Sequence, residues 1–321
     1  MSVTLPHWIR TKNGVAFSDV PTQTGGRLPN FLIIGAAKAG TTSIFRYLGQ
    51  HPQIHTCLLK EPHFFSTDQI YEYGFDWYKG LYADAKIDQI CGEASTSYSM
   101  WPKTASTPQR IYDVVPDVKL IYIIREPIAR IESECLQIFK YSRYVLGDQS
   151  LPSSVDALLE YMTDEKNGVG IHPIHNSEYI RQINQYLRLF KRDQLLILFQ
   201  EDLQHQPGET LSKTFEFLGV DKDFKIDLAQ KHNVTQNFTQ GLKVEKFTDS
   251  LRKVPGYGLI KRLLPASSKE AVKSFATSKI IKEDAVQSMS DETRNRLAEH
   301  FRPLNNELAD FLHRDISHWN L

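Results

Sequence analysis

The sequence carries no excess of charge of either sign. Its 321 residues include 38 Lys and Arg side chains and 38 Asp and Glu side chains, so the formal net charge is zero. A chain without a basic excess lacks the long-range positive field that attracts polyanions. We therefore expect no nucleic acid partner, although local basic patches remain compatible with this balance.

Cysteine is also scarce. The chain has 3 cysteines, Cys57, Cys91 and Cys135, and they are widely spaced. Their spacing matches no metal-ligand pattern, and an odd number argues against a disulfide framework. We predict that all three pack as small apolar side chains and that the protein has no metal site.

Long apolar runs are missing too. No segment reaches the roughly 20 apolar residues that a membrane-spanning helix needs, and residues 1–8 lack the apolar core of a signal peptide. These absences predict a cytoplasmic protein without a transmembrane segment. Residues 250–264 mix basic and apolar side chains, which is compatible with peripheral membrane contact. The favoured interpretation of that stretch is an amphipathic helix packed on the protein with its charges in water.

The most informative segment that is present runs from Phe31 to Ser43. Its first four residues are continuously apolar, as in a parallel strand covered on both faces. Gly35 and Gly40 then allow a sharp turn, and the hydroxyl residues after Gly40 open a helix. Amides and hydroxyls at a helix start form an anion site, to which Lys38 adds a positive charge. The segment predicts a phosphate-binding loop.

This loop departs from the loop of nucleotide kinases and ATPases. The two glycines have the Walker A spacing, but Thr41 stands where those proteins carry lysine. The next clear strand, residues 119–124, is followed by Arg125 and not by a metal-binding Asp. An arginine there predicts a second anion site, and so a ligand with two separate phosphates and no required metal. A P-loop nucleotide kinase remains the alternative.

With these two motifs the chain resembles sulfotransferases that use 3′-phosphoadenosine 5′-phosphosulfate (PAPS). The resemblance implies that Arg125 and Ser133 hold the 3′-phosphate. Segments 60–65 and 91–98 are similar to the heparan sulfate sulfotransferase branch and to stand-alone bacterial members, and the similarity spans most of residues 28–321. The residues implied to bind the 5′-phosphosulfate are Lys38, Ala39, Gly40, Thr41, Thr42 and Ser43.

The implied reaction moves a sulfuryl group from PAPS to a hydroxyl of a carbohydrate or small natural product, with an amine as the less favoured acceptor group. Lys38 would neutralise the leaving phosphate of adenosine 3′,5′-bisphosphate. Glu93 follows a strand-like run at 87–91, at the edge where open parallel sheets bind ligands. A partly buried carboxylate there has a raised pKa, which suits a general base. Lys60 and His63 are the further catalytic candidates. A non-catalytic nucleotide-binding protein is the other alternative.

Three features of related enzymes are absent from this sequence. It has no Lys-Thr-His segment, no C-terminal Arg-Lys-Gly loop, and no lysine- and glycine-rich loop held by a cysteine pair. The third side of the PAPS site is therefore unassigned. Residues 231–233, Lys-His-Asn, lie in the corresponding region and are the candidates for it.

The element pattern predicts an α/β fold: a P-loop-NTPase-like parallel sheet flanked by helices, with a mainly helical C-terminal part. Residues 1–27 form a peripheral arm and residues 28–321 a single domain, in which 221–290 make an acceptor-side or lid region. A strand is expected at 194–199, and a final helix pair at 290–313 is expected to break at Pro303. The other expected helices are 103–114, 126–143, 153–165, 177–191 and 207–218.

Overall fold

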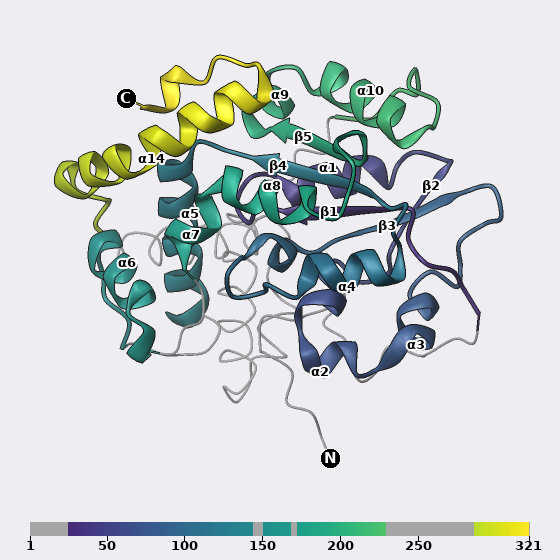
Figure 1. The fold of residues 1–321 in the computed structure, drawn as a ribbon, viewed down its shortest axis with the longest axis horizontal. Helices are drawn as coiled ribbons and strands as arrows, with labels where there is room; N and C mark the ends of the chain where they lie inside the picture. The colour runs from purple at the N-terminus through teal and green to yellow at the C-terminus, as the bar shows by residue number, and fades with distance from the viewer. Residues whose placement is uncertain (1–24, 144–149, 168–171, 229–285, 321) are drawn as a thin grey trace, which may run out of the picture. The chain divides into compact units, whose positions relative to one another are not determined.

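A parallel five-stranded sheet forms the centre of the fold, with strand order β2-β3-β1-β4-β5 (Figure 1). The computed structural model describes residues 25–143, 150–167, 172–228 and 286–320. This arrangement confirms the predicted fold class. The strands are β1 Phe31–Gly35, β2 Ile54–Thr56, β3 Ile90–Ala94, β4 Lys119–Ile124 and β5 Leu195–Phe199.

The strand order reverses beside β1. The chain runs from β1 outward to β2, returns through β3, and then crosses to β4 and β5 on the other side. Leu32 pairs with Glu93 on β3 and with Leu120 on β4. In open parallel sheets the crevice at such a reversal, outside the carboxyl ends of the strands, is where ligands bind. The topology therefore places the glycine-containing loop after β1 at the expected binding edge.

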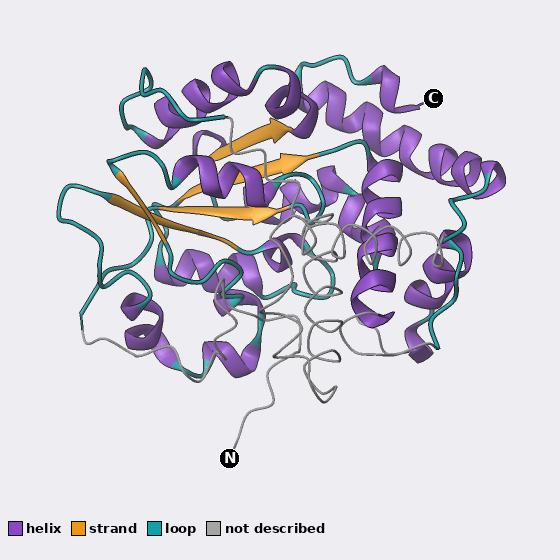
Figure 2. Ribbon diagram, turned by 180° about the vertical axis from the view of Figure 1, so that it is seen from behind, coloured by secondary structure: helices purple, strands orange, loops and turns teal. Residues whose placement is uncertain are grey.

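Helices flank the sheet in Figures 1 and 2 because each has one apolar face to bury. In α8, for example, Ile180, Ile183 and Tyr186 recur on one face and are all buried. Within the described residues, no helix is both long and apolar enough to cross a bilayer. The helices around the sheet are α1 Thr41–Leu48, α2 Asp68–Tyr71, α3 Gly74–Gly80, α4 Thr107–Val114, α7 Pro173–Ser177, α8 Tyr179–Leu187, α9 Gln200–His205 and α10 Pro207–Leu218.

The chain divides into two compact units. The first contains residues 1–131, 172–231 and 296–321, and the second contains 132–171 and 232–295. Helices α5 (Pro127–Tyr141) and α14 (Asp291–Leu312) pass from one unit to the other. In the second unit, Ser154 caps α6 (Val155–Thr163) and pairs with Gln287.

Most predicted elements are confirmed, and two predictions were wrong. The strand expected from residue 87 begins at Ile90, because Ile87 lies in a turn and is 96% exposed. The expected helix pair at 290–313 is one helix, α14, which continues through Pro303. Buried Phe301 and Leu308 lie on either side of this proline, so packing holds the helix together despite the lost amide. Residues 1–24 of the arm predicted at 1–27, and residues 229–285 of the lid region predicted at 221–290, lie outside the described residues.

Core packing agrees with the sequence on two further points. Cys57, Cys91 and Cys135 are all buried, as predicted for small side chains packed in the interior. Phe64 and Phe65, which follow His63, are fully buried. Phe64 stacks on Tyr78 with ring centroids 4.2 Å apart. This aromatic contact links the segment after Lys60 to α3.

Candidate active site

The glycine loop, residues 35–40, joins β1 to α1. Its backbone has positive φ angles at Gly40 (101°) and at Lys38 (69°). Gly40 adopts such an angle at little cost, whereas Lys38 is held there by its surroundings. The Gly40 carbonyl accepts hydrogen bonds from the amides of Ser43 at 3.0 Å and Ile44 at 3.1 Å, which begins α1. The loop thus directs a helix N-terminus, with its positive dipole end, to the carboxyl edge of the sheet.

Arg125 reaches this loop from the end of β4. Its Nη1 donates to the carbonyl of Lys38 at 3.3 Å. The hydroxyl of Tyr179 on α8 donates to the Arg125 carbonyl at 2.7 Å and fixes the backbone there. The two predicted anion-binding elements are therefore in direct contact, although they are 87 residues apart in the sequence.

Glu93 lies on β3, next to β1, and its side chain is 0% exposed. Oε1 accepts hydrogen bonds from the hydroxyls of Tyr78 at 2.8 Å and Tyr98 at 2.5 Å, and Oε2 accepts one from Ser95 at 2.6 Å. Burial raises the pKa of Glu93 to about 7, against the opposing effect of these three hydroxyl groups. The carboxyl is thus poised to exchange a proton near neutral pH.

A strained turn in the segment after β2 contacts the residues that follow Glu93. Glu61 and His63 have φ angles of 64° and 54°, which residues other than glycine seldom adopt. The amide and hydroxyl of Thr96 donate to Glu61 Oε2 at 2.8 and 2.9 Å, and Lys60 forms an ion pair with Glu61. These contacts tie the turn to the chain just after Glu93 and stabilise its unusual backbone.

His63 links this turn to two serines. Its amide donates to Ser95 Oγ at 3.0 Å, and its Nδ1 lies 2.6 Å from Ser97 Oγ. Because Ser95 also donates to Glu93, one hydroxyl bridges Glu93 and His63. Burial lowers the pKa of His63, which favours the neutral imidazole. Burial alone would raise the pKa of Glu61, but the charges of Lys60 and His63, together with the hydrogen bonds from Lys60 and Thr96, lower that pKa below its usual value.

The predicted site residues fall into two neighbouring groups. One is the glycine loop with Arg125, and the other contains Glu93, Lys60 and His63. The loop follows β1 and Glu93 lies near the end of adjacent β3, so both groups lie at the carboxyl edge of the sheet. Ser133 is half-buried on α5 in the second unit, and its pairing with Arg125 stays a prediction. Residues 231–233 lie outside the described residues.

Sequence reasoning missed several residues that hold this site together. Ser95 and Tyr98 lie in the 91–98 segment, so their closeness to Glu93 in the chain was a usable signal. Tyr78 gave no such signal, because α3 brings it to Glu93 through the fold. Arg130 lies between Arg125 and Ser133 and was assigned no role from the sequence, yet it is 0% exposed and donates to the Ala37 carbonyl at 3.2 Å.

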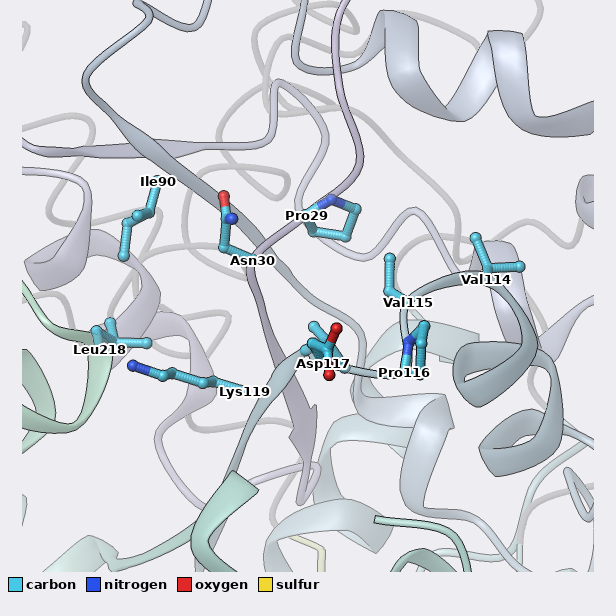
Figure 3. Close-up of a pocket in the computed structure, with 10 residues that line it drawn as sticks. Pro29, Asn30, Ile90, Val114, Val115, Pro116, Asp117, Lys119 and Leu218 are labelled. Carbon is cyan, nitrogen blue, oxygen red and sulfur yellow. The ribbon is translucent and has the colours of Figure 1, made fainter. Parts of the chain in front are cut away.

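A separate pocket of about 400 Å³ lies at the opposite edge of the sheet (Figure 3). Asn30, Ile90 and Lys119 of its lining stand at the amino ends of β1, β3 and β4. The glycine loop leaves the carboxyl end of β1, so this pocket is distinct from the site described above. Its lining consists of Pro29, Asn30, Ile90, Val114, Val115, Pro116, Asp117, Val118, Lys119 and Leu218.

Comparison with known proteins gives a family match over most of the chain. Residues 28–314 match the family described as "Sulfotransferase domain". The mouse heparan sulfate glucosamine 3-O-sulfotransferase 6 is 29% identical over 222 residues, which are 66% of this chain and 58% of that protein. The mouse heparan sulfate glucosamine 3-O-sulfotransferase 3B1 is 30% identical over 220 residues, 66% of this chain and 51% of that protein. The chain thus spans about half to three-fifths of the length of these relatives.

A solved structure shares the fold. The sulfotransferase from Alicyclobacillus acidocaldarius superimposes with a TM-score of 0.62 at 24% identity, covering 92% of this chain and all of that one. At this identity the likeness concerns the fold alone. It agrees with the parallel sheet and flanking helices described above.

Proposed function

The chain belongs to the sulfotransferase domain family, and from this membership we propose that it transfers the sulfuryl group of PAPS to a hydroxyl group. The observation that carries the proposal is the contact between the glycine loop and Arg125. A helix N-terminus with Lys38 and an arginine at the next strand end together suit a nucleotide with two separate phosphates.

In the proposed donor complex, the 5′-phosphosulfate lies against Lys38 and the start of α1. Amides after Gly40 and the hydroxyls of Thr41, Thr42 and Ser43 supply its hydrogen bonds. Arg125, with Ser133, binds the 3′-phosphate. As the S–O bond breaks, the 5′-phosphate gains negative charge, which Lys38 and the loop amides stabilise. Sulfuryl transfer then depends mainly on positioning and charge, as phosphoryl transfer does.

Glu93 is the proposed general base. The attacking hydroxyl must lose its proton, and a carboxylate with a pKa near 7 can take it at neutral pH. Oε2 accepts a hydrogen bond from Ser95, and a carboxylate oxygen has room for a second one. Lys60, which pairs with Glu61, and His63, which is linked to Glu93 through Ser95, are the candidates to contact the sulfuryl group or the acceptor.

The proposed acceptor is a carbohydrate, with a small natural product as the second class. The 3-O-sulfotransferases that this chain matches support a sugar hydroxyl over an amine. The proposal keeps residues 221–290 as the acceptor-side region. A kinase activity is disfavoured because Thr41 replaces the catalytic lysine and Arg125 the metal-binding acid.

Transfer of isotope-labelled sulfate tests the proposal. The protein is incubated with labelled PAPS and either heparan sulfate or a metabolite extract, and the products are analysed by mass spectrometry. We expect label in a sugar-containing product together with adenosine 3′,5′-bisphosphate. Release of the bisphosphate with no sulfated acceptor in either mixture would contradict the proposed acceptor class, and no use of PAPS at all would contradict the activity.

A further inference from the structure

Arg130 is a fully buried arginine beside the glycine loop. It is 0% exposed and is the largest side chain among the fully buried residues described. Removing a guanidinium from water is costly unless hydrogen bonds compensate for it. Apolar side chains could fill the same volume without that cost. An arginine at this buried position is therefore best explained by the hydrogen bonds that its guanidinium makes.

The guanidinium of Arg130 connects the loop to helix α7. Nη1 donates to the Ala37 carbonyl at 3.2 Å, inside the glycine loop. Nη2 donates to the Pro173 carbonyl at 2.6 Å, and Nε donates to Ser177 Oγ at 2.6 Å. Ser177 also donates to the Pro173 carbonyl at 2.9 Å. The two groups of α7 that Arg130 contacts are therefore hydrogen-bonded to each other.

These bonds orient the peptide that precedes the side chain of Lys38. The bond between Ala37 and Lys38 is a planar trans peptide, so its carbonyl and amide point in opposite directions. Since the Ala37 carbonyl points to Arg130, the Lys38 amide points away from it. Arg125 holds the next carbonyl, that of Lys38, at 3.3 Å. Arg130 and Arg125 thus hold consecutive carbonyls of the loop.

We infer that Arg130 is a positioning residue that holds the glycine loop in the conformation that binds the 5′-phosphate end of the donor. It touches the loop backbone from the buried side and α7 on its other side. Arg125, at the strand end, acts mainly on the 3′-phosphate. This division rests on the proposed PAPS donor, and it predicts that the two arginines affect different phosphates.

The test compares three nucleotides on matched variants. Binding of adenosine 3′,5′-bisphosphate, adenosine 5′-monophosphate and adenosine 3′-monophosphate is measured by calorimetry, directly or in competition, without magnesium. The variants are Arg130→Lys, Ser177→Ala and Arg125→Ala. Arg192→Lys is the control, since Arg192 donates to the Leu195 carbonyl at the amino end of β5, away from the loop.

Lysine at position 130 keeps the charge but cannot reach three partners with a planar fork. We expect Arg130→Lys to bind both nucleotides with a 5′-phosphate about tenfold more weakly and to bind the 3′-monophosphate within about twofold of the wild-type protein. Ser177→Ala should weaken binding of the same two nucleotides, but by a smaller factor than Arg130→Lys. Arg125→Ala should weaken binding of the two nucleotides with a 3′-phosphate and leave binding of the 5′-monophosphate nearly unchanged. Arg192→Lys should leave the affinities for all three nucleotides unchanged.

Equal weakening of all three nucleotides, or no weakening, in folded Arg130→Lys would overturn the inference. If that variant melts well below the wild-type protein, the ratio of the two monophosphate affinities in Ser177→Ala decides instead, and an unchanged ratio there rejects the role of Arg130. A wild-type protein that binds no bisphosphate removes the proposed donor, and the inference falls with it. The experiment therefore distinguishes rejection of PAPS as the donor from rejection of the positioning role of Arg130 alone.

Discussion

At Glu93, burial and hydrogen bonding act in opposite directions. Burial favours the neutral carboxyl, whereas donated hydroxyl bonds from Tyr78, Tyr98 and Ser95 favour the carboxylate. Burial is the larger effect, and the pKa settles at about 7 instead of the ordinary 4.5. A general base with this pKa is ionised in half of the molecules near neutral pH and holds a captured proton well enough to assist the transfer.

The first prediction concerns the chemistry at this residue. Glu93→Gln removes the proton acceptor but keeps the side-chain size, so sulfate transfer should fall by at least about 100-fold, as expected for loss of a general base. Affinity for adenosine 3′,5′-bisphosphate should stay unchanged. Glu178→Gln is the matched control, because Glu178 is also a buried glutamate but is bonded to Arg181 and His300. Near-normal transfer by Glu93→Gln would remove Glu93 as the base.

The second prediction follows from linkage at the same carboxyl. Between about pH 4.5 and 7 the unfolded chain has released this proton while the folded protein keeps it. The folded state therefore binds more protons, and this group lowers stability as pH rises through that window. Glu93→Gln should lack this slope, because glutamine does not titrate. The stability of the variant relative to the wild-type protein should therefore be greater at pH 8 than at pH 4.5, by on the order of 3 kcal/mol. Urea unfolding of both proteins at the two pH values measures it, and equal slopes would refute the assigned pKa.

The third prediction concerns the effect of the Tyr98 hydroxyl on the pKa of Glu93. Tyr98→Phe deletes a 2.5 Å hydrogen bond to Oε1, so the pKa of Glu93 should rise further. The acidic limb of the kcat profile should then move to higher pH, with full activity recovered at alkaline pH. Tyr186→Phe is the control, since Tyr186 is equally buried but donates to the Tyr98 carbonyl at 2.8 Å. A uniform loss of activity at every pH would instead indicate a purely structural Tyr98.

Among the helices, strands and loops, the sequence predicted those whose residues form a contiguous pattern. Strands β1, β4 and β5 were predictable because all or nearly all of their residues are apolar and buried. The glycine loop was predictable because its two glycines, lysine and hydroxyls are contiguous. In contrast, β2 has three residues with one of them buried, which is too short for a pattern.

The site was predictable only where its residues lie in local motifs. Arg125 and Glu93 follow or end strands, so the parallel topology brings both to one edge. The contact of Tyr78 with Glu93 depends on α3 packing through Phe64, which no local pattern contains. Arg130 lies close to Arg125 in the sequence, but its burial under the loop is a property of the folded chain.

The fourth prediction concerns helix α14. Pro303 lies inside this helix, is exposed, and cannot donate an intrahelical hydrogen bond. Pro303→Ala should raise the free energy of unfolding by about 1 kcal/mol or more, because the amide is restored and alanine favours helix. Thermal and urea unfolding measure the change. A destabilised variant would mean that the proline ring contributes packing that outweighs the missing bond.

For the whole molecule, the central claim is that one edge of the sheet binds a nucleotide with two separate phosphates. The reversal of strand order beside β1 brings the glycine loop, Arg125 and Glu93 to that edge. The pocket between the amino ends of the strands lies at the other edge and has no part in the claim. The family match over residues 28–314 agrees with a donor site of this kind.

The most direct measurement is a calorimetric titration of the wild-type protein with adenosine 3′,5′-bisphosphate in the presence of EDTA, and with ATP with and without magnesium. We predict binding of the bisphosphate at roughly micromolar dissociation constants, the range of about −8 kcal/mol, without any metal, and much weaker binding of ATP. Magnesium-dependent binding of ATP together with no affinity for the bisphosphate would contradict the account and favour a nucleotide kinase.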